Sequence, residues 1–253
     1  MKARLALTAL ASALAACTAP RTAPSTAAAA SSPALLARAG QLVVVTTPGW
    51  DATTGTLRRY ERASAGDAWR AVGAPVAVVV GRTGLAWDDA LDAPAPEPRK
   101  REGDGKSPAG LFPVDTAFGF PAREASPWVR LPYVALTAAH ECVDDAASAH
   151  YNTVVARTAV PRVDWQSAEK MRAISVYRLG AIIGYNAPPR PGRGSCIFFH
   201  VWDGPQSVTA GCTAMEERAL RELIAWMDPT RRPVVVQLTE GAYDLRRATW
   251  RLP

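Results

Sequence analysis

The sequence is poor in the residues that most often carry metal and redox chemistry. Its 253 residues include four cysteines and three histidines, and no two cysteines form a tight C-x-x-C pair. That spacing disfavours a structural zinc site. The rival interpretation is a zinc site built from His140, Cys142, Cys196 and His200. We expect no metal and no cofactor.

Basic clusters and long apolar segments are also missing. The formal net charge is +6, but no run of Lys and Arg is interleaved with aromatic residues. This pattern disfavours nucleic acid as a partner. Beyond the N-terminal segment, no apolar run has the length of a transmembrane helix. An apolar fraction of 48% is enough for a packed core, and the length suits one ordinary domain or two small ones.

The N-terminal segment has the organisation of an export signal. Lys2 and Arg4 precede an apolar stretch, residues 5–14, that is too short to span a bilayer. The following Leu-Ala-Ala-Cys, which ends at Cys17, resembles a bacterial lipoprotein cleavage site. We expect residues 1–17 to be a lipoprotein signal peptide with Cys17 as the lipidated residue. The alternative is an ordinary signal peptide that is cut nearby.

The next segment, residues 18–39, is rich in Ala, Ser, Thr and Pro, and we expect a flexible tether. Thr18 follows Cys17 directly. An Asp at this position would change the membrane to which the lipoprotein is sorted. By resemblance to lipoprotein sorting signals, Thr18 favours the outer membrane. We therefore expect an exported, periplasmic protein with a lipid anchor in the membrane and one folded domain over residues 40–253.

The pattern within that domain is mainly β. Short apolar runs rich in β-branched residues are separated by turns that contain Gly or Pro, and this predicts a sandwich or barrel rather than βαβ units. The polar, Pro-rich residues 88–106 are expected to form a long exposed loop. The predicted strands are residues 41–47, 57–62, 76–80, 133–136, 174–177, 181–185, 196–200 and 234–238.

One helix is predicted directly after Cys212. Thr213 and Glu216 have the spacing of a capping box, and an apolar stripe follows them. Cys212 would then lie at a helix N-terminus, where the partial positive charge lowers a thiol pKa. We also expect the amides of Gly211 and Cys212 to bind a developing oxyanion. The stripe consists of Leu220, Leu223, Ile224 and Met227.

His200 is the best-placed candidate base for this thiol. It ends an apolar strand eleven residues before Gly211, and a nucleophilic Cys needs a base within hydrogen-bond reach. Without Cys17, three cysteines remain and three pairings are open. If Cys212 stays free, Cys142 and Cys196 are the remaining pair.

These residues resemble the YkuD-type L,D-transpeptidase catalytic domain. The family pattern is a His, a spacer, and Ser/Thr-His-Gly-Cys with an Arg two residues after the Cys. Here His200 precedes Thr209-Ala210-Gly211-Cys212-Thr213-Ala214, so Ala210 replaces the second His and Ala214 replaces the Arg. Upstream, residues 105–112 resemble the family's Thr-Pro-x-Gly-x-Phe segment. The resemblance covers residues 75–240 approximately.

The resemblance implies a β-sandwich or barrel of L,D-transpeptidase type, with a helix after the catalytic Cys. It also implies a cysteine acyltransferase that acts on peptidoglycan stem peptides through a thioester. Cys212 would be the nucleophile and His200 the base, with Gly211 beside them. Lys106, Trp202 and Thr209 are the candidate substrate-binding residues, and a solvated loop charge is the alternative for Lys106. The alternative functions are a non-catalytic peptidoglycan-binding envelope lipoprotein, an L,D-carboxypeptidase and a cysteine peptidase.

Overall fold

The computed structural model describes residues 32–88 and 98–253. The interpretations made for residues 1–17, for Cys17, for residues 18–31 and for residues 89–97 of the predicted loop lie outside this part of the chain. No helix in the described part is long and apolar enough to cross a membrane.

The elements of the described part run through the chain as follows. The strands are β1 Gln41–Thr47, β2 Thr54–Glu61, β3 Arg70–Val79, β4 Leu85–Trp87, β5 Ser107–Gly119, β6 Tyr133–Ala135, β7 His140–Val143, β8 Val154–Ala156, β9 Ala168–Lys170, β10 Leu179–Ile183, β11 Phe198–Val201, β12 Thr213–Met215 and β13 Val234–Thr239. The α-helices are α1 Ser32–Arg38, α2 Glu217–Trp226 and α3 Glu240–Trp250. The 3-10 turns are η1 Arg123–Ala125, η2 Arg157–Ala159, η3 Met171–Ala173, η4 Ser175–Arg178 and η5 Pro229–Arg231.

The main sheet curls into a barrel, which confirms the predicted mainly β fold. Its strands follow the order β10-β11-β12-β3-β2-β1-β13-β5, and β5 also pairs with β10, which closes the ring. The seam between β12 and β3 rests on a single residue pair, Ala214 and Val79, whereas β2 and β3 pair over most of their length. The barrel wall is therefore least tightly paired beside β12.

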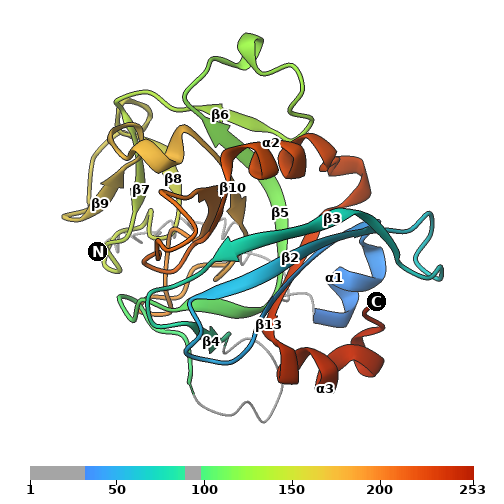
Figure 1. The fold of residues 1–253 in the computed structure, drawn as a ribbon. Coiled ribbons are helices and arrows are strands. Elements are labelled where there is room, and N and C mark those ends of the chain that lie inside the picture. Colours follow the sequence, from blue (N-terminus) through green and yellow to red (C-terminus); the bar gives the residue numbers. More distant parts are fainter. Residues whose placement is uncertain (1–31, 89–97) are drawn as a thin grey trace, which may run out of the picture.

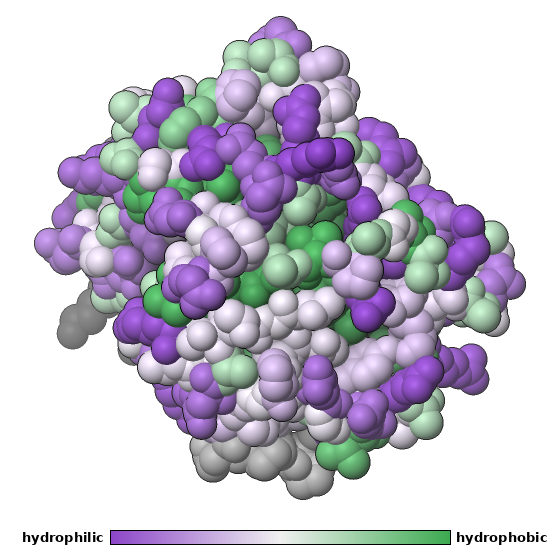
Figure 2. Space-filling model, viewed as in Figure 1, coloured by the Kyte–Doolittle hydropathy of each residue, from purple (hydrophilic) through white to green (hydrophobic). Residues whose placement is uncertain are grey.

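Strand β1 shows why apolar residues fill both faces of this wall. Side chains alternate along a strand, so Val43 and Val45 join the cluster inside the barrel while Leu42 and Val44 join a second cluster outside it. Helices α1 and α3 lie together over the outer cluster (Figure 1). Figure 2 shows mainly hydrophilic residues over the face seen in Figure 1, with small hydrophobic areas between them.

Helix α2 caps the inner cluster with the apolar stripe that its sequence predicts. Leu220, Leu223 and Ile224 are buried on one side of the helix. The helix begins later than predicted, because Thr213 belongs to β12 and the side chain of Glu216 caps the helix by accepting from the Ala219 amide. The predicted capping box at Thr213 is wrong, since pairing with β11 holds that residue extended.

A second, small sheet stands beside the barrel. Its three strands follow the order β8-β7-β9, and the chain forms it between β6 and β10 (Figure 1). A third apolar cluster joins this sheet to the barrel and contains Phe118, Met171, Tyr177 and Phe198. The small sheet thus packs against the strand that carries His200.

Two further segments differ from the sequence-based predictions. Residues 174–177, predicted as a strand, form η4 and the residue before it. The end of the predicted tether forms α1, which is attached to the body because Arg62 donates to the carbonyl oxygens of Leu36 and Ala39. The ordered body therefore includes residues 32–39 as well as residues 40–88 and 98–253.

Candidate active site

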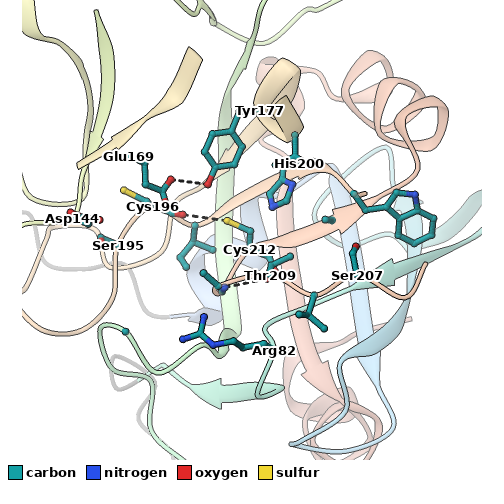
Figure 3. Close-up of a pocket in the computed structure, with 18 of the residues that line it drawn as sticks. Arg82, Asp144, Glu169, Tyr177, Ser195, Cys196, His200, Ser207, Thr209 and Cys212 are labelled. Carbon is teal, nitrogen blue, oxygen red and sulfur yellow. Dashed lines mark hydrogen bonds between the residues drawn. The ribbon is translucent and has the colours of Figure 1, made fainter. Parts of the chain in front are cut away.

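Two neighbouring parallel strands place His200 and Cys212 in one cavity. His200 on β11 is paired with Ala214 on β12, and Cys212 lies two residues before Ala214. Side chains two residues apart point to the same face of a strand, so Cys212 and Ala214 share the face on which His200 lies. All three line a cavity of about 390 Å³. Figure 3 shows His200 and Cys212 in this cavity.

The loop before β12 is fastened through the backbone carbonyl of Cys212. The hydroxyls of Thr209 and Ser107 both donate to this oxygen, at 2.6 and 2.9 Å. A side chain at Gly211 would put its Cβ 3.0 Å from the carbonyl oxygen of Lys106, so glycine permits a close approach of the two backbones. The position of Cys212 is thereby set by β5 as well as by its own loop.

The Cys212 thiol is buried and hydrogen-bonded to backbone groups. Its Sγ donates to the carbonyl oxygen of Cys196 and accepts from the amide of Phe198, each at 3.3 Å. Burial raises the thiol pKa, and the negative charge of Glu169 raises it further. The expected lowering by a helix N-terminus is wrong, because β12 separates Cys212 from α2.

His200 is buried in the same cavity and is fixed by one ring nitrogen. Its Nδ1 lies 2.7 Å from the carbonyl oxygen of Val201, and since a carbonyl can only accept, Nδ1 is the donor. Nε2 is then the nitrogen available for proton transfer. Desolvation lowers the pKa of His200, which keeps the ring neutral and able to accept a proton. Within the described residues, His200 and the Cys212 thiol share the cavity without a direct hydrogen bond.

The oxyanion-binding role expected of the Gly211 amide is not supported. That amide donates to the hydroxyl of Thr209 at 3.1 Å, so its proton is already used. Among the described residues, we find no hydrogen-bond acceptor for the amide of Cys212, which makes it the better-placed of the two donors.

The candidate substrate-binding residues separate into two groups. Trp202 and Thr209 line the cavity. The side chain of Lys106 lies elsewhere, because its Nζ pairs with Asp51 at 3.2 Å and donates to the carbonyl oxygen of Thr83. Lys106 therefore does not line the cavity, and its side chain, 17% exposed, is held by these contacts and is not the solvated loop charge of the alternative interpretation.

Cys142 and Cys196 form a disulfide with an S–S distance of 2.05 Å, and Cys212 is the free thiol of the described residues. The bond links β7 of the small sheet to the segment just before β11. It also removes both thiolates from the rival zinc site. Within residues 32–88 and 98–253, no group of three or more His, Cys, Asp or Glu side chains is arranged to hold a metal ion.

Sequence reasoning missed two residues beside the thiol, Glu169 and Tyr177. Tyr177 donates to Glu169 Oε2 at 2.7 Å, and both residues line the same cavity as the Cys212 thiol. Burial raises the pKa of Glu169 to about 7. Glu169 lies on the short strand β9 and carries no motif that could have revealed it.

A comparison with known protein families finds one match. Residues 50–236, well over half of the chain, match the model of the YkuD family, described as the L,D-transpeptidase catalytic domain. Neither the curated proteins nor the solved structures include a match.

Proposed function

We propose that this chain, which belongs to the L,D-transpeptidase catalytic domain family, is a cysteine-dependent acyltransferase that acts on peptidoglycan stem peptides. The observation that carries the proposal is the cavity shared by Cys212 and His200 on adjacent parallel strands. A thiol that can attack a carbonyl and an imidazole that can take its proton are the two groups that such chemistry needs.

The reaction begins with proton transfer from the thiol. Because the pKa of Cys212 is raised and that of His200 is lowered, neither group is charged before substrate binds. As Sγ attacks the peptide carbonyl, its proton passes to Nε2 of His200, and the imidazolium formed is then the counter-charge of the oxyanion. The amide of Cys212 is the proposed donor to that oxyanion.

Collapse of the tetrahedral intermediate completes acylation. The C–N bond breaks, the departing amine takes the proton from His200, and the acyl group remains on Cys212 as a thioester. An acceptor amine then attacks the thioester and gives a crosslink, or water attacks and gives trimming of the carboxypeptidase type. Both outcomes return the thiol, and both use the same two side chains.

The departures from the family motif affect which charged residues can bind the substrate. Ala214 stands beside His200 where the family has an Arg, so the cavity lacks a guanidinium at that point. Arg82 lines another part of the same cavity and is the proposed source of positive charge toward substrate carboxylates. The acyl donor is thus expected to bind in a different orientation from that imposed by the motif Arg.

The test is incubation of the purified chain with isolated muropeptides, with Cys212→Ala as the matched variant and mass spectrometry of the products. We expect new crosslinked or shortened muropeptides with the native chain and none with the variant. Identical products across several donors would favour a peptidoglycan-binding protein without activity, a reading that the burial of Cys212 supports. Cleavage of an added protein substrate, with the muropeptides unchanged, would identify a cysteine peptidase.

We also propose that residues 1–17 direct export and that Cys17 is lipidated, with the outer membrane as the anchor site. The support is the sequence pattern alone. Expression with a labelled fatty acid tests this, and Cys17→Ser is the control. We expect label in the native chain and none in the variant, and equal labelling would contradict the proposal.

A further inference from the structure

The carboxylate of Glu169 is built into the surroundings of the nucleophile. Its Oε2 accepts the Tyr177 hydroxyl proton at 2.7 Å, and the side chains of Glu169 and Tyr177 both lie next to Cys212 (Figure 3). All three residues line the cavity, and Figure 3 shows Glu169, Tyr177 and Cys212 side by side. The small sheet and η4 therefore each place one side chain beside the reacting sulfur.

The position of Tyr177 is determined by packing as well as by this hydrogen bond. Its ring meets those of His200 and Phe198 edge-on, with centroids 5.3 and 5.4 Å apart. A ring held on two sides cannot easily swing its hydroxyl away from the thiol. The hydroxyl is thus a fixed neighbour of Cys212, and Glu169 determines which way its proton points.

The charges around this group are mainly negative. Lys100 and Arg82 are cations that line the same cavity, and the Lys100 ammonium is paired with Asp104 at 2.7 Å. A buried thiol that ionises beside a carboxylate creates a second negative charge in the same low-dielectric space, which is unfavourable. The titratable and charged groups that face Glu169 and Cys212 are Glu102, Asp144, Tyr177, His200, Lys100 and Arg82.

We propose that Glu169 is a positioning residue that controls when Cys212 becomes a thiolate. While its carboxylate is charged, the sulfur keeps its proton; when the carboxylate charge is cancelled, the sulfur can lose that proton to His200. The Tyr177 hydroxyl stabilises the thiolate once it forms. This inference rests on the proposed role of Cys212 as the nucleophile.

The pH dependence of thiol alkylation distinguishes this role from a structural one. Glu169 titrates near pH 7, so the Cys212 pKa takes a lower value below that pH and a higher value above it. We expect a step in the plot of log alkylation rate against pH, with the same slope on both sides. The measurement is iodoacetamide labelling of the Cys212 peptide in the full chain, followed by mass spectrometry.

Three variants are expected to change the alkylation rate in three different ways. Glu169→Gln keeps the shape but removes the charge, so the step disappears and the rate at pH 8.5 rises about tenfold, which corresponds to a fall of one unit in the thiol pKa. Tyr177→Phe removes the hydroxyl that stabilises the thiolate, so the rate falls. Glu141→Gln changes a buried carboxylate of the same small sheet that does not line the cavity, and we expect no change in the step.

A comparison of two reagents tests the same point without any substitution. Iodoacetate carries a negative charge and iodoacetamide is neutral, and the two are similar in size. In the native chain, the rate ratio of iodoacetate to iodoacetamide should fall as pH rises from 6.5 to 8.5, because Glu169 becomes charged. Glu169→Gln should abolish this fall.

The inference is overturned if the native chain shows no step and a constant reagent ratio. It is also overturned if Glu169→Gln and Tyr177→Phe change the rate in the same direction, since that is the effect of a loosened cavity. Alkylation requires no peptidoglycan. The expected pattern together with unchanged muropeptides would therefore uphold control by Glu169 and contradict the proposed acyltransferase.

Discussion

His200 and Ala214 lie directly opposite each other on the parallel strands β11 and β12, and both face the cavity that contains the Cys212 thiol. A charge at position 214 can therefore act on both the proposed base and the proposed nucleophile. The small side chain leaves that point uncharged.

A charge restored at this point should activate the thiol. In Ala214→Arg, the guanidinium enters the cavity and stabilises a thiolate, so the alkylation rate of Cys212 should rise about threefold or more at neutral pH. Ala214→Met is the control, because it adds a chain of comparable width without charge. Labelling with iodoacetamide provides the measurement, and equal rates in the two variants would count against an electrostatic effect.

The Thr209 hydroxyl should be needed to hold the loop of the nucleophile. Thr209→Val preserves the shape but removes the donor to the Cys212 carbonyl and the acceptor for the Gly211 amide. We expect a loss of about 1–3 kcal/mol in the free energy of unfolding and a clear fall in muropeptide turnover. Thr209→Ser keeps both hydrogen bonds and should restore turnover. If Thr209→Ser also loses muropeptide turnover, the methyl group of Thr209 and not its hydroxyl is required.

Removal of the disulfide should destabilise the chain strongly. The bond joins residues 54 apart in the sequence, and closure of a loop of that size corresponds to about 4 kcal/mol in the unfolded-state entropy model. We expect Cys142→Ala/Cys196→Ala to lower the free energy of unfolding by a similar amount, measured as a fall in the urea midpoint. Cys17→Ser is the control and should leave the midpoint unchanged. A double variant as stable as the native chain would contradict this expectation.

Glu169 should make the chain less stable as the pH rises. The folded-state pKa is raised from 4.5 to about 7, so the folded chain holds this proton more tightly than the unfolded chain does. The contribution of Glu169 is most favourable below about pH 4.5 and declines until the pH has passed 7, by at most about 3 kcal/mol. Urea unfolding at pH 5 and pH 8 should show this decline, and Glu169→Gln should show less of it. An identical pH dependence in native and variant chains would exclude the effect.

The sequence was sufficient where packing and local pattern agree. Residues 41–47 were predicted as a strand and form β1 with the same bounds, because β-branched residues suit a strand covered on both faces. The sequence also placed His200 near Cys212, on the argument that a strand end and a helix start meet across one site; the two residues share a cavity, although the helix begins later than expected. Both inferences depend on short-range features that a single sequence displays.

The sequence was insufficient where distant contacts decide the outcome. Thr213 has the local features of a helix cap, yet pairing with β11 makes it part of β12. Helix α1 is short, and contacts from Arg62 hold it to the body. Glu169 is recognisable only after the small sheet has packed against η4. In each case the deciding partner lies far away in the chain.

The disulfide has a consequence for how the cavity matures. Cys142 belongs to the same small sheet that carries Glu169 and the adjoining Asp144, and Cys196 lies beside the thiol. Oxidation of that pair therefore fixes one wall of the cavity onto the barrel. Completion of the site is thus coupled to the redox state of the compartment in which the chain folds, and under reducing conditions the barrel could form while the wall that faces Cys212 is not covalently secured.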